Sequence, residues 1–517
     1  MTAPKILIYF TPDVQEKGRI PLSDIKFEAS KKLDRGKYEI TLKTPSFISG
    51  NCTSLKSSIK STATLTFKNE CFGEKTKYVI KVNDYFEIWD DSVEGEEWCY
   101  FRGIVKQTSS DEQGMEKRFT INLENAGGWL LGDNAVYYLS QLIIAQGQAP
   151  SNFFKPIKTL YGWVDAGGNP TSKGEALRFS LIQTPQQLLE TLVNGFANER
   201  LKLLKKDFYD NSEAIKSLDY YTGSAINENK LFIANKLSEM EGAIIDILKM
   251  FEGRPFSEIF IIERTGKTQV VWRNSRWRDY EEKLCMGNSS GELENLITLY
   301  SDPNIQFTGD GLVNTDEGQT TERKYSGILT ETVNKTNDTV VNAVFIFPDM
   351  FDSRRNVPTS VLAQTAYDSF QAKQILDLNS VIRHGYKPVN IKLPFVPGYM
   401  DPVEYDKTPP SKRSEVDDSQ TAAIGRLMTE YTAYAVSMYN NIQDSGNGID
   451  TFQNNLHCTI ADDFRIVRSQ TEEPLYVNVN KITWYFDSSS PRTAIEWDRG
   501  FERRRDSGFS PQEFGFA

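Results

Sequence analysis

The chain has 517 residues, a mass of 58.8 kDa and a formal net charge of −11. Its length predicts about three or four domains, and its 39% hydrophobic and 25% charged residues exclude a wholly disordered chain. The acidic balance argues against a nucleic-acid coat or a binder of anionic membranes, because both neutralise phosphate groups. No apolar run of about 18 residues predicts a membrane span, and the N-terminal residues do not form a secretory signal, so a cytoplasmic origin is expected.

Residues 1–130 predict a β-rich domain. Short runs there alternate apolar and polar side chains, which is the period of a strand with one buried face. Strands are expected at residues 6–10, 38–42, 63–67, 84–89, 98–105 and 119–124. The last strands of the series include a hairpin with an acidic loop. Short strands at this close spacing favour a small barrel or sandwich.

Residues 131–300 predict a mixed α/β domain that ends in a β-hairpin. Thr184 and Pro185 stand where an N-cap and a first-turn proline belong, directly before apolar residues at helical spacing. The expected elements are helices over 188–196 and 236–251 and a hairpin of strands 256–264 and 268–273 with its turn at 265–267.

Residues 301–500 predict a second β domain with a helical insertion at about 350–450. Strand patterns cover 301–345 and return near the end of the domain, at 464–467, 476–479, 482–486 and 493–497. Inside the insertion, composition and spacing predict helices over 358–383 and 419–443, separated by a polar, proline-bearing loop over 401–418. Residues 501–517 are expected to form a loose C-terminal tail.

Three patterns could indicate chemistry, and each has a plainer interpretation. Gly287–Gly291 matches a GxSxG nucleophile elbow, but polar residues precede it, which favours a turn. His457 beside Cys458 suggests a nucleophilic pair, yet strand neighbours point to opposite faces, which favours a half-buried strand histidine. The acidic run Asp90–Glu97 lacks the register of a calcium loop, which favours a solvated hairpin tip.

Other chemistry has less support. No glycine-rich phosphate loop follows a strand. The five cysteines are widely spaced, form no CxxC pair and are expected to be reduced and mostly buried. Arg503–Arg505 is either a solvated tail or a docking site for an acidic partner, and carboxylate pairs for glycoside hydrolysis stay open because their geometry is not visible in a sequence. We therefore assign no catalytic, cofactor-binding, metal or other binding residues.

Three groups of residues carry a further pattern. They are Val82–Trp89 with Tyr100–Val105, Phe251–Phe260 with Gly266–Arg273, and Tyr476–Trp484 with Thr493–Gly500. In this order they resemble the baseplate hub family of contractile phage tails and related injection machines. The first group resembles one barrel of that family, the second a helix, a proline-containing turn and a hairpin, and the third its closing hairpin. The chain departs from the family in a longer, more helical stretch over 348–460 and in lacking a lysozyme or peptidase module at its C-terminus.

The resemblance implies an α+β multidomain fold. Two hub-type antiparallel β-barrel domains would flank a mixed helical middle region, with helical insertions. It also implies a homotrimer that adapts a sixfold tail tube to a threefold spike and forms part of the channel for DNA ejection. The implied partners are a tail tube or tube-initiator protein, a central spike, baseplate wedge proteins, and DNA or a tape-measure protein in the lumen. The implied location is the virion tail baseplate, after assembly in the host cytoplasm.

Two alternatives stay open. Tail-tip proteins of non-contractile siphophages share a similar N-terminal fold, and a cell-wall hydrolase is a further candidate. The resemblance implies no enzyme activity and no cofactor for the chain itself.

Overall fold

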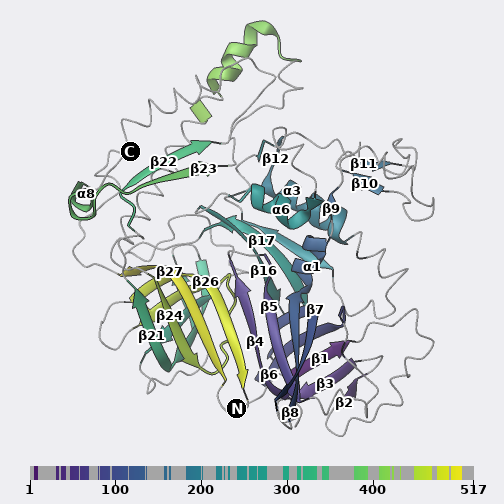
Figure 1. Ribbon diagram of the computed structural model, residues 1–517. Coiled ribbons are helices and arrows are strands. Elements are labelled where there is room, and N and C mark those ends of the chain that lie inside the picture. Colours follow the sequence, from purple (N-terminus) through teal and green to yellow (C-terminus); the bar gives the residue numbers. More distant parts are fainter. Residues whose placement is uncertain are drawn as a thin grey trace.

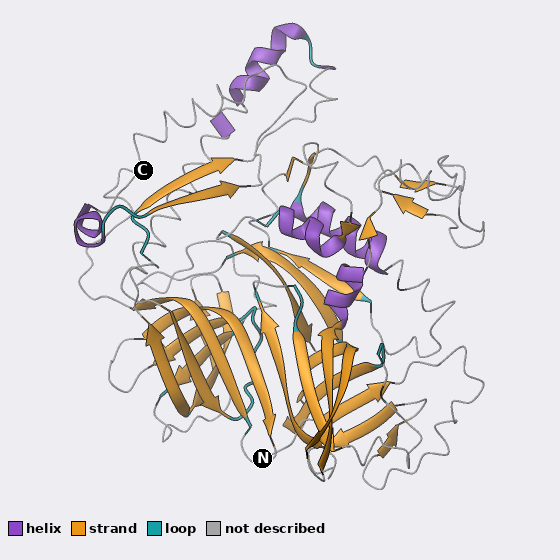
Figure 2. Ribbon diagram, viewed as in Figure 1, coloured by secondary structure: helices purple, strands orange, loops and turns teal. Residues whose placement is uncertain are grey.

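The computed structural model shows an α+β chain that is mostly β-sheet with few helices (Figures 1 and 2). No described helix is long and apolar enough to cross a membrane. The structure describes residues 5–9, 31–33, 37–41, 47–56, 59–68, 80, 82–93, 96–113, 116–133, 135–136, 157–159, 162–164, 182–198, 201, 217–223, 226, 231–232, 242–252, 256–264, 266–275, 295–301, 311–315, 318–334, 340–348, 378–393, 407–419, 422–423, 431, 447–467, 474–487 and 491–502.

The first module, here called the N-terminal strand set, is antiparallel throughout and follows the order β4-β5-β8-β7-β6-β1-β3-β2. Its strands are β1 (Lys5–Tyr9), β2 (Lys31–Leu33), β3 (Lys37–Thr41), β4 (Phe47–Leu55), β5 (Thr62–Lys68), β6 (Tyr85–Val93), β7 (Glu96–Gln113) and β8 (Glu116–Asn125). All six expected strands are confirmed. The sequence pattern missed β4 because its small polar residues show no clean alternation.

The second module, here called the C-terminal ring, is a path of paired strands whose two end strands, β20 and β21, follow one another in the chain. The path runs β20-β18-β25-β26-β27-β24-β21, and β19 pairs with β20 outside it. Its strands are β18 (Leu296–Tyr300), β19 (Gly311–Thr315), β20 (Gly318–Ser326), β21 (Ile328–Asn334), β24 (Asn447–Gln453), β25 (Asp463–Val467), β26 (Pro474–Asp487) and β27 (Arg492–Glu502). The strands expected at 464–467 and 493–497 are confirmed, and those expected at 476–479 and 482–486 are one continuous strand.

Gly327 links the two ends of this path, because it lies between β20 and β21 in the chain. Its φ is +97°, a left-handed conformation that favours glycine. Its N–H donates to the Tyr300 carbonyl at 3.1 Å, and its own carbonyl accepts from the Gln453 N–H at 3.1 Å. The Gly327 backbone is therefore hydrogen-bonded to both β18 and β24.

One expectation for the second module is wrong in detail, because the ring is not wholly antiparallel. Strand β18 runs parallel to both of its neighbours, β20 and β25. The reason is the connection: β19 lies between β18 and β20 in the chain and pairs antiparallel with β20. The chain therefore reverses in β19 and re-enters the sheet in the direction of β18.

Strand β26 joins the two modules. One of its edges pairs with β27, while its other edge pairs first with β25, through Pro474–Val477, and then with β4, through Lys481–Asp487. A single apolar core runs through both modules and includes Phe67 and Phe101 from the first and Phe464 and Phe486 from the second. Hydrogen bonds and packing both fix the modules side by side (Figure 1).

A third layer covers this junction. It contains a three-stranded sheet in the order β13 (Leu218–Thr222), β17 (Lys267–Asn274), β16 (Ser257–Arg264). The helices α1 (Ala126–Asp133), α3 (Pro185–Leu192), η3 (Val193–Asn198, a π-helix) and α6 (Ile244–Met250) lie on its far side (Figures 1 and 2). The hairpin expected at 256–273 is confirmed, and so is the cap at Thr184, whose hydroxyl accepts from the Gln187 N–H.

The helix expected over 236–251 starts later than its apolar stripe suggested. Gly242–Ala243 forms the short strand β15, which pairs with β9 (Ala135–Val136), and α6 begins only at Ile244. Tertiary strand pairing thus overrides the helical period there. Other short strands of this region are β10 (Ile157–Thr159), β11 (Gly162–Val164), β12 (Ile182–Gln183) and β14 (Leu231–Phe232).

The expected insertion is described only in part. It contains the helix α8 (Leu378–His384) and the strand β23 (Pro388–Leu393), which pairs in parallel with β22 (Ala343–Pro348) directly before the insertion. The loop expected over 401–418 is wrong from residue 410 onward, because residues 410–419 are helical, while residues 401–406 lie outside the described residues. Pro410 opens that helix, and a first-turn proline favours a helix start rather than a loop. Most of the helix expected over 419–443, and residues 351–377, lie outside the described residues.

Candidate functional site

The β16–β17 hairpin, here called the wedge hairpin, lies between the strand modules and the helix layer. Its residues alternate between two cores, as expected for a sheet buried on both faces. Phe260 and Ile262 pack into the core shared by the two modules, whereas Ile259 and Ile261 pack against the helices. The wedge hairpin therefore touches every layer of the junction, and a charged cluster stands at each of its ends.

The first cluster, the turn cluster, consists of Glu87, Arg102, Glu263 and Thr268. The Arg102 side chain is 0% exposed and reaches from β7 to the hairpin turn. Its Nη1 donates to Glu263 Oε2 at 3.2 Å, to the Arg264 carbonyl at 2.7 Å and to the Lys267 carbonyl at 3.1 Å. One buried guanidinium therefore holds the turn of the wedge hairpin onto the N-terminal strand set.

Two carboxyl groups share this guanidinium. Glu87 Oε1 lies 3.5 Å from Arg102 Nε, and Glu87 also accepts from the Tyr85 hydroxyl at 3.2 Å and from Trp89 Nε1 at 3.0 Å. Glu263 Oε2 accepts from the Thr268 hydroxyl at 2.6 Å. Burial raises the pKa of Glu263 to about 7, even though Arg102 and Thr268 act in the opposite direction.

The second cluster, the root cluster, consists of Lys56, Glu258, Arg273 and Asn478. Glu258 accepts from Arg273 Nε at 2.9 Å and lies 3.3 Å from Lys56 Nζ. Arg273 Nη1 donates to the Ala461 carbonyl at 2.8 Å, and Lys56 Nζ donates to Asn478 Oδ1 at 3.2 Å. Since Lys56 follows β4 while Ala461 and Asn478 belong to the second module, this cluster ties the wedge hairpin to both modules.

Burial and charge act differently on the two partners of the root cluster. Burial lowers the pKa of Lys56, although Glu258 acts in the opposite direction. Burial also pushes the pKa of Glu258 up, but Lys56 and Arg273 together overcome this effect and leave it below its ordinary value. The Glu258 carboxylate is thus stabilised in its charged form by the two cations around it.

A third contact between the modules centres on His457. Its Nε2 lies 3.0 Å from Asp90 Oδ2, and the Tyr100 hydroxyl donates to the same oxygen at 3.0 Å. The Trp98 ring stacks on the His457 ring with centroids 5.3 Å apart, and the Arg323 guanidinium lies 5.3 Å from the Trp98 centroid. The β6–β7 hairpin of the first module thus contacts His457 of the second module through both a polar contact and ring stacking.

These contacts correct two expectations from the sequence. His457 does not lie in a strand but in the irregular segment 455–459, where the polar ring can reach Asp90 across the module boundary. Asp90 does not lie in a solvated tip but in β6, and it is buried because Tyr100 and His457 cover its carboxylate. The expected β6–β7 hairpin is confirmed.

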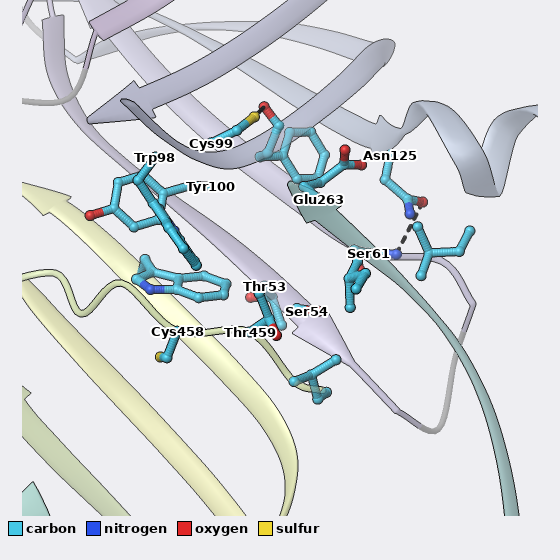
Figure 3. Close-up of a pocket in the computed structure, with 15 residues that line it drawn as sticks. Thr53, Ser54, Ser61, Trp98, Cys99, Tyr100, Asn125, Glu263, Cys458 and Thr459 are labelled. Carbon is cyan, nitrogen blue, oxygen red and sulfur yellow. Dashed lines mark hydrogen bonds between the residues drawn. The ribbon is translucent and has the colours of Figure 1, made fainter. Parts of the chain in front are cut away.

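The same junction encloses a cavity of about 20 Å³, which is room for roughly one water molecule. Figure 3 shows its lining, with Cys99 and Glu263 on one side and Cys458 and Thr459 on another. Burial raises the pKa of the Cys99 and Cys458 thiols well above the ordinary value, as it does for Cys52. Buried, protonated thiols are poor nucleophiles, which argues against a Cys458 nucleophile.

The three described cysteines are free and buried, as expected. In the part of the chain that the structure describes, no three His, Cys, Asp or Glu side chains are grouped to hold a metal ion. Gly287–Gly291 and Arg503–Arg505 lie outside the described residues.

Sequence patterns alone did not single out the charged residues of the two clusters. The available sign was a charged residue inside an otherwise apolar strand run: Arg102 within 98–105, Glu258 within 256–262 and Arg273 at the end of 270–273. Lone charges at such positions are rarely fully buried without a partner. The partners are far away in the sequence, so no local pattern could name them.

Comparisons with known proteins give structural neighbours but no sequence relatives. No family model matches the sequence, and no curated protein matches it. The structure is similar to the 43 kDa tail protein of prophage MuSo2 from Shewanella oneidensis, with 11% identity, 90% of this chain and 96% of that chain covered, and a TM-score of 0.42. It is similar to the prophage tail protein gp18 from Listeria monocytogenes, with 9% identity, 97% and 95% covered, and a TM-score of 0.37.

A third neighbour is the E. coli c3393 protein, described as a component of the type VI secretion system with structural similarity to the T4 tail proteins gp27 and gp5. Here the identity is 7%, the match covers 90% of this chain and 76% of that chain, and the TM-score is 0.34.

Proposed function

We propose that this chain is a non-catalytic structural subunit of a phage-tail baseplate or of a related injection machine. In this proposal it forms a homotrimeric hub, and the N-terminal strand set and the C-terminal ring are its two hub-type barrel domains. Three chains would supply six strand modules to one annulus, which meets a sixfold tube on one side and a threefold spike on the other. The three groups of residues that resemble the hub family provide the sequence support.

The observation that carries the proposal is the shared strand β26. An adapter between two symmetries needs its modules at a fixed spacing, since a hinge between them would let the annulus deform. The split edge of β26, which pairs with β25 and then with β4, supplies that rigidity through backbone hydrogen bonds. The Lys56–Asn478 bond of the root cluster and the His457 contact add side-chain bonds across the same boundary.

The proposed partners are a tail tube or tube-initiator protein, a central spike, baseplate wedge proteins, and DNA or a tape-measure protein passing through the lumen. The proposed location is the virion tail, with assembly in the host cytoplasm. The formal charge of −11 supports a channel that does not retain DNA, because like charges discourage phosphate binding.

Native mass spectrometry of the purified chain tests the assembly. We expect a species at three times 58.8 kDa and threefold class averages with six similar lobes around a channel. A monomer at all concentrations would contradict the hub. Tight binding of duplex DNA at physiological salt would contradict the lumen, and cleavage of purified peptidoglycan would contradict the non-catalytic role and favour the hydrolase alternative.

A further inference from the structure

The turn cluster holds more acid than base. Its charged groups are one guanidinium, Arg102, and two carboxyls, Glu87 and Glu263, and their side chains are 0%, 5% and 8% exposed. If both carboxyls were ionised, the cluster would carry a buried net negative charge. Such a charge is expensive to keep away from water, and a buried acid commonly avoids the cost by holding a proton.

The hydrogen bonds distinguish the two carboxyls. Glu87 has both oxygens bonded, because Oε1 accepts from Tyr85 and Oε2 accepts from Trp89. Glu263 receives both of its donors, Arg102 and Thr268, on Oε2. Among the described residues, Glu263 Oε1 is buried with no hydrogen-bond partner. Of the two acids, Glu263 is therefore the one whose charge is less well stabilised.

Among the described residues, the cation whose charge acts on Glu263 is Arg102. The titratable groups that face Glu263 are Arg102 and Cys99 from β7 and Tyr85 and Glu87 from β6. At the turn itself, Arg264 and Lys267 contribute carbonyls to Arg102, and the Lys267 ammonium points outward, 2.9 Å from Asp219.

The junction cavity lies beside this carboxyl. Glu263 is part of the lining of the space of about 20 Å³, together with Cys99, Phe101 and Asn125 (Figure 3). One water molecule in that space could accept a hydrogen bond from the O–H of a protonated carboxyl.

We propose that the Glu263 carboxyl carries a proton in the folded chain up to about neutral pH, and that loss of this proton loosens the turn of the wedge hairpin from β7. The junction between the layers then contains a proton-dependent clamp: it is tightest in mildly acidic solution and weaker above neutral pH. This inference concerns a single chain and does not depend on the proposed assembly.

The sign of the pH effect follows from proton counts. When the turn opens, Glu263 regains the ordinary Glu pKa of 4.5, whereas burial in the closed state raises it to about 7. Between these two values the closed state holds a proton that the open state releases, so raising the pH favours opening. One proton changes the opening constant by up to about tenfold per pH unit, and the effect ends above about pH 7.

The test compares wild type with Glu263→Gln by urea unfolding at pH values from 5 to 7. Between pH 5 and 7, the unfolding constant of wild type should rise more steeply with pH than that of the variant, by up to about tenfold per pH unit. The reason is that the variant has no proton to release at this position. The matched control is Glu190→Gln, which changes an exposed glutamate of α3 and should keep the wild-type slope. Equal slopes for wild type and Glu263→Gln would overturn the proposal.

A second measurement uses only the wild-type chain and therefore does not depend on folding of the variant. Hydrogen exchange, corrected for the intrinsic pH dependence of amide exchange, compares peptides at the turn of the wedge hairpin with peptides from β26. Protection at the turn should fall by up to about tenfold per pH unit between pH 5 and 7, relative to β26. Parallel behaviour of the two sets of peptides would overturn the proposal.

Discussion

The two ends of the wedge hairpin both bury charged side chains, but the ratio of acidic to basic groups is opposite at the two ends. At the turn, one cation, Arg102, serves two carboxyls, whereas at the root one carboxylate, Glu258, serves two cations. Both clusters are buried. In each one, a single group of one charge, here called the minority group, pairs with two groups of the opposite charge, here called the surplus groups. A buried cluster can therefore contain unequal numbers of acidic and basic groups, provided that one of its surplus groups becomes neutral by gaining or losing a proton.

The two ends should also respond to acid in opposite ways. Burial raises the pKa of Glu263, so its contribution to stability is present below the ordinary Glu value and is lost as the pH rises to about 7. The pKa of Glu258 is lowered, so its contribution is present above the ordinary Glu value and is lost as the pH falls through its folded pKa. Mild acid therefore tightens the turn, and strong acid releases the root.

The largest expected effect comes from removing the minority cation at the turn. Arg102→Met leaves Glu87 and Glu263 without their cation and removes three hydrogen bonds to the hairpin. We expect a loss of about 3–5 kcal/mol in the free energy of unfolding at pH 8, and a smaller loss at pH 5, where a carboxyl can take up a proton. Urea unfolding at the two pH values measures both.

The matched control for Arg102→Met is Lys267→Met at the same turn. The Lys267 pair with Asp219 is roughly half exposed on both sides, and such surface pairs contribute about 0–1 kcal/mol. Similar losses for the two variants would show that Arg102 is not the residue that holds the turn.

At the root, the minority group is the carboxylate. Glu258→Gln leaves Lys56 and Arg273 buried without a negative charge, and we expect a loss of about 3 kcal/mol at pH 7. The penalty should shrink as the pH falls below the ordinary Glu value toward the lower folded pKa of Glu258, because the unfolded wild-type chain then takes up a proton that the folded carboxylate does not. A penalty that stays constant from pH 7 to pH 3 would mean that the charge of Glu258 contributes little.

The sequence predicts interactions between residues that are close in the chain, but not those between residues that are distant in it. The hairpin turn at 265–267, the Thr184 cap and the β6–β7 hairpin were predictable, because residues within a few positions of one another determine them. The pairing of β26 with β4 was not, since these strands lie more than 400 residues apart, and β4 has no strong alternation of its own.

The same limit applies to the site. A lone Arg102 in an apolar strand signals a buried partner, but Glu263 lies 161 positions away and only the fold brings the two together. The sequence predicts a solvated position for Asp90 and a half-buried one for His457, and only the fold brings these two side chains together across 367 positions. Local patterns predict whether a side chain is buried better than they predict which partner it finds.

Removal of a surplus group should cost much less than removal of a minority group. Lys56→Met keeps most of the side-chain volume and leaves the Glu258–Arg273 pair intact, and burial already lowers the pKa of Lys56. We expect a loss of about 1 kcal/mol, because replacing one buried charge by an apolar group of similar size removes its desolvation cost along with its bonds. Urea unfolding of Lys56→Met and Glu258→Gln at pH 7 compares their losses in the free energy of unfolding. Equal losses would refute the distinction between minority and surplus groups.

A similarly small effect at pH 5 separates the two charge states of Glu263. Thr268→Val removes the hydroxyl that donates to Glu263 Oε2 at 2.6 Å while keeping the side-chain shape. A hydrogen bond to a neutral carboxyl contributes about 0.5–1.5 kcal/mol and one to a carboxylate about 1.5–3 kcal/mol. The loss at pH 5 should therefore be about 1 kcal/mol and should grow toward pH 8 as Glu263 ionises, whereas the pH dependence of Lys56→Met should show no such rise. A loss that is identical at pH 5 and pH 8 would place the proton elsewhere than on Glu263, since only a change in the charge of the acceptor alters the strength of this bond.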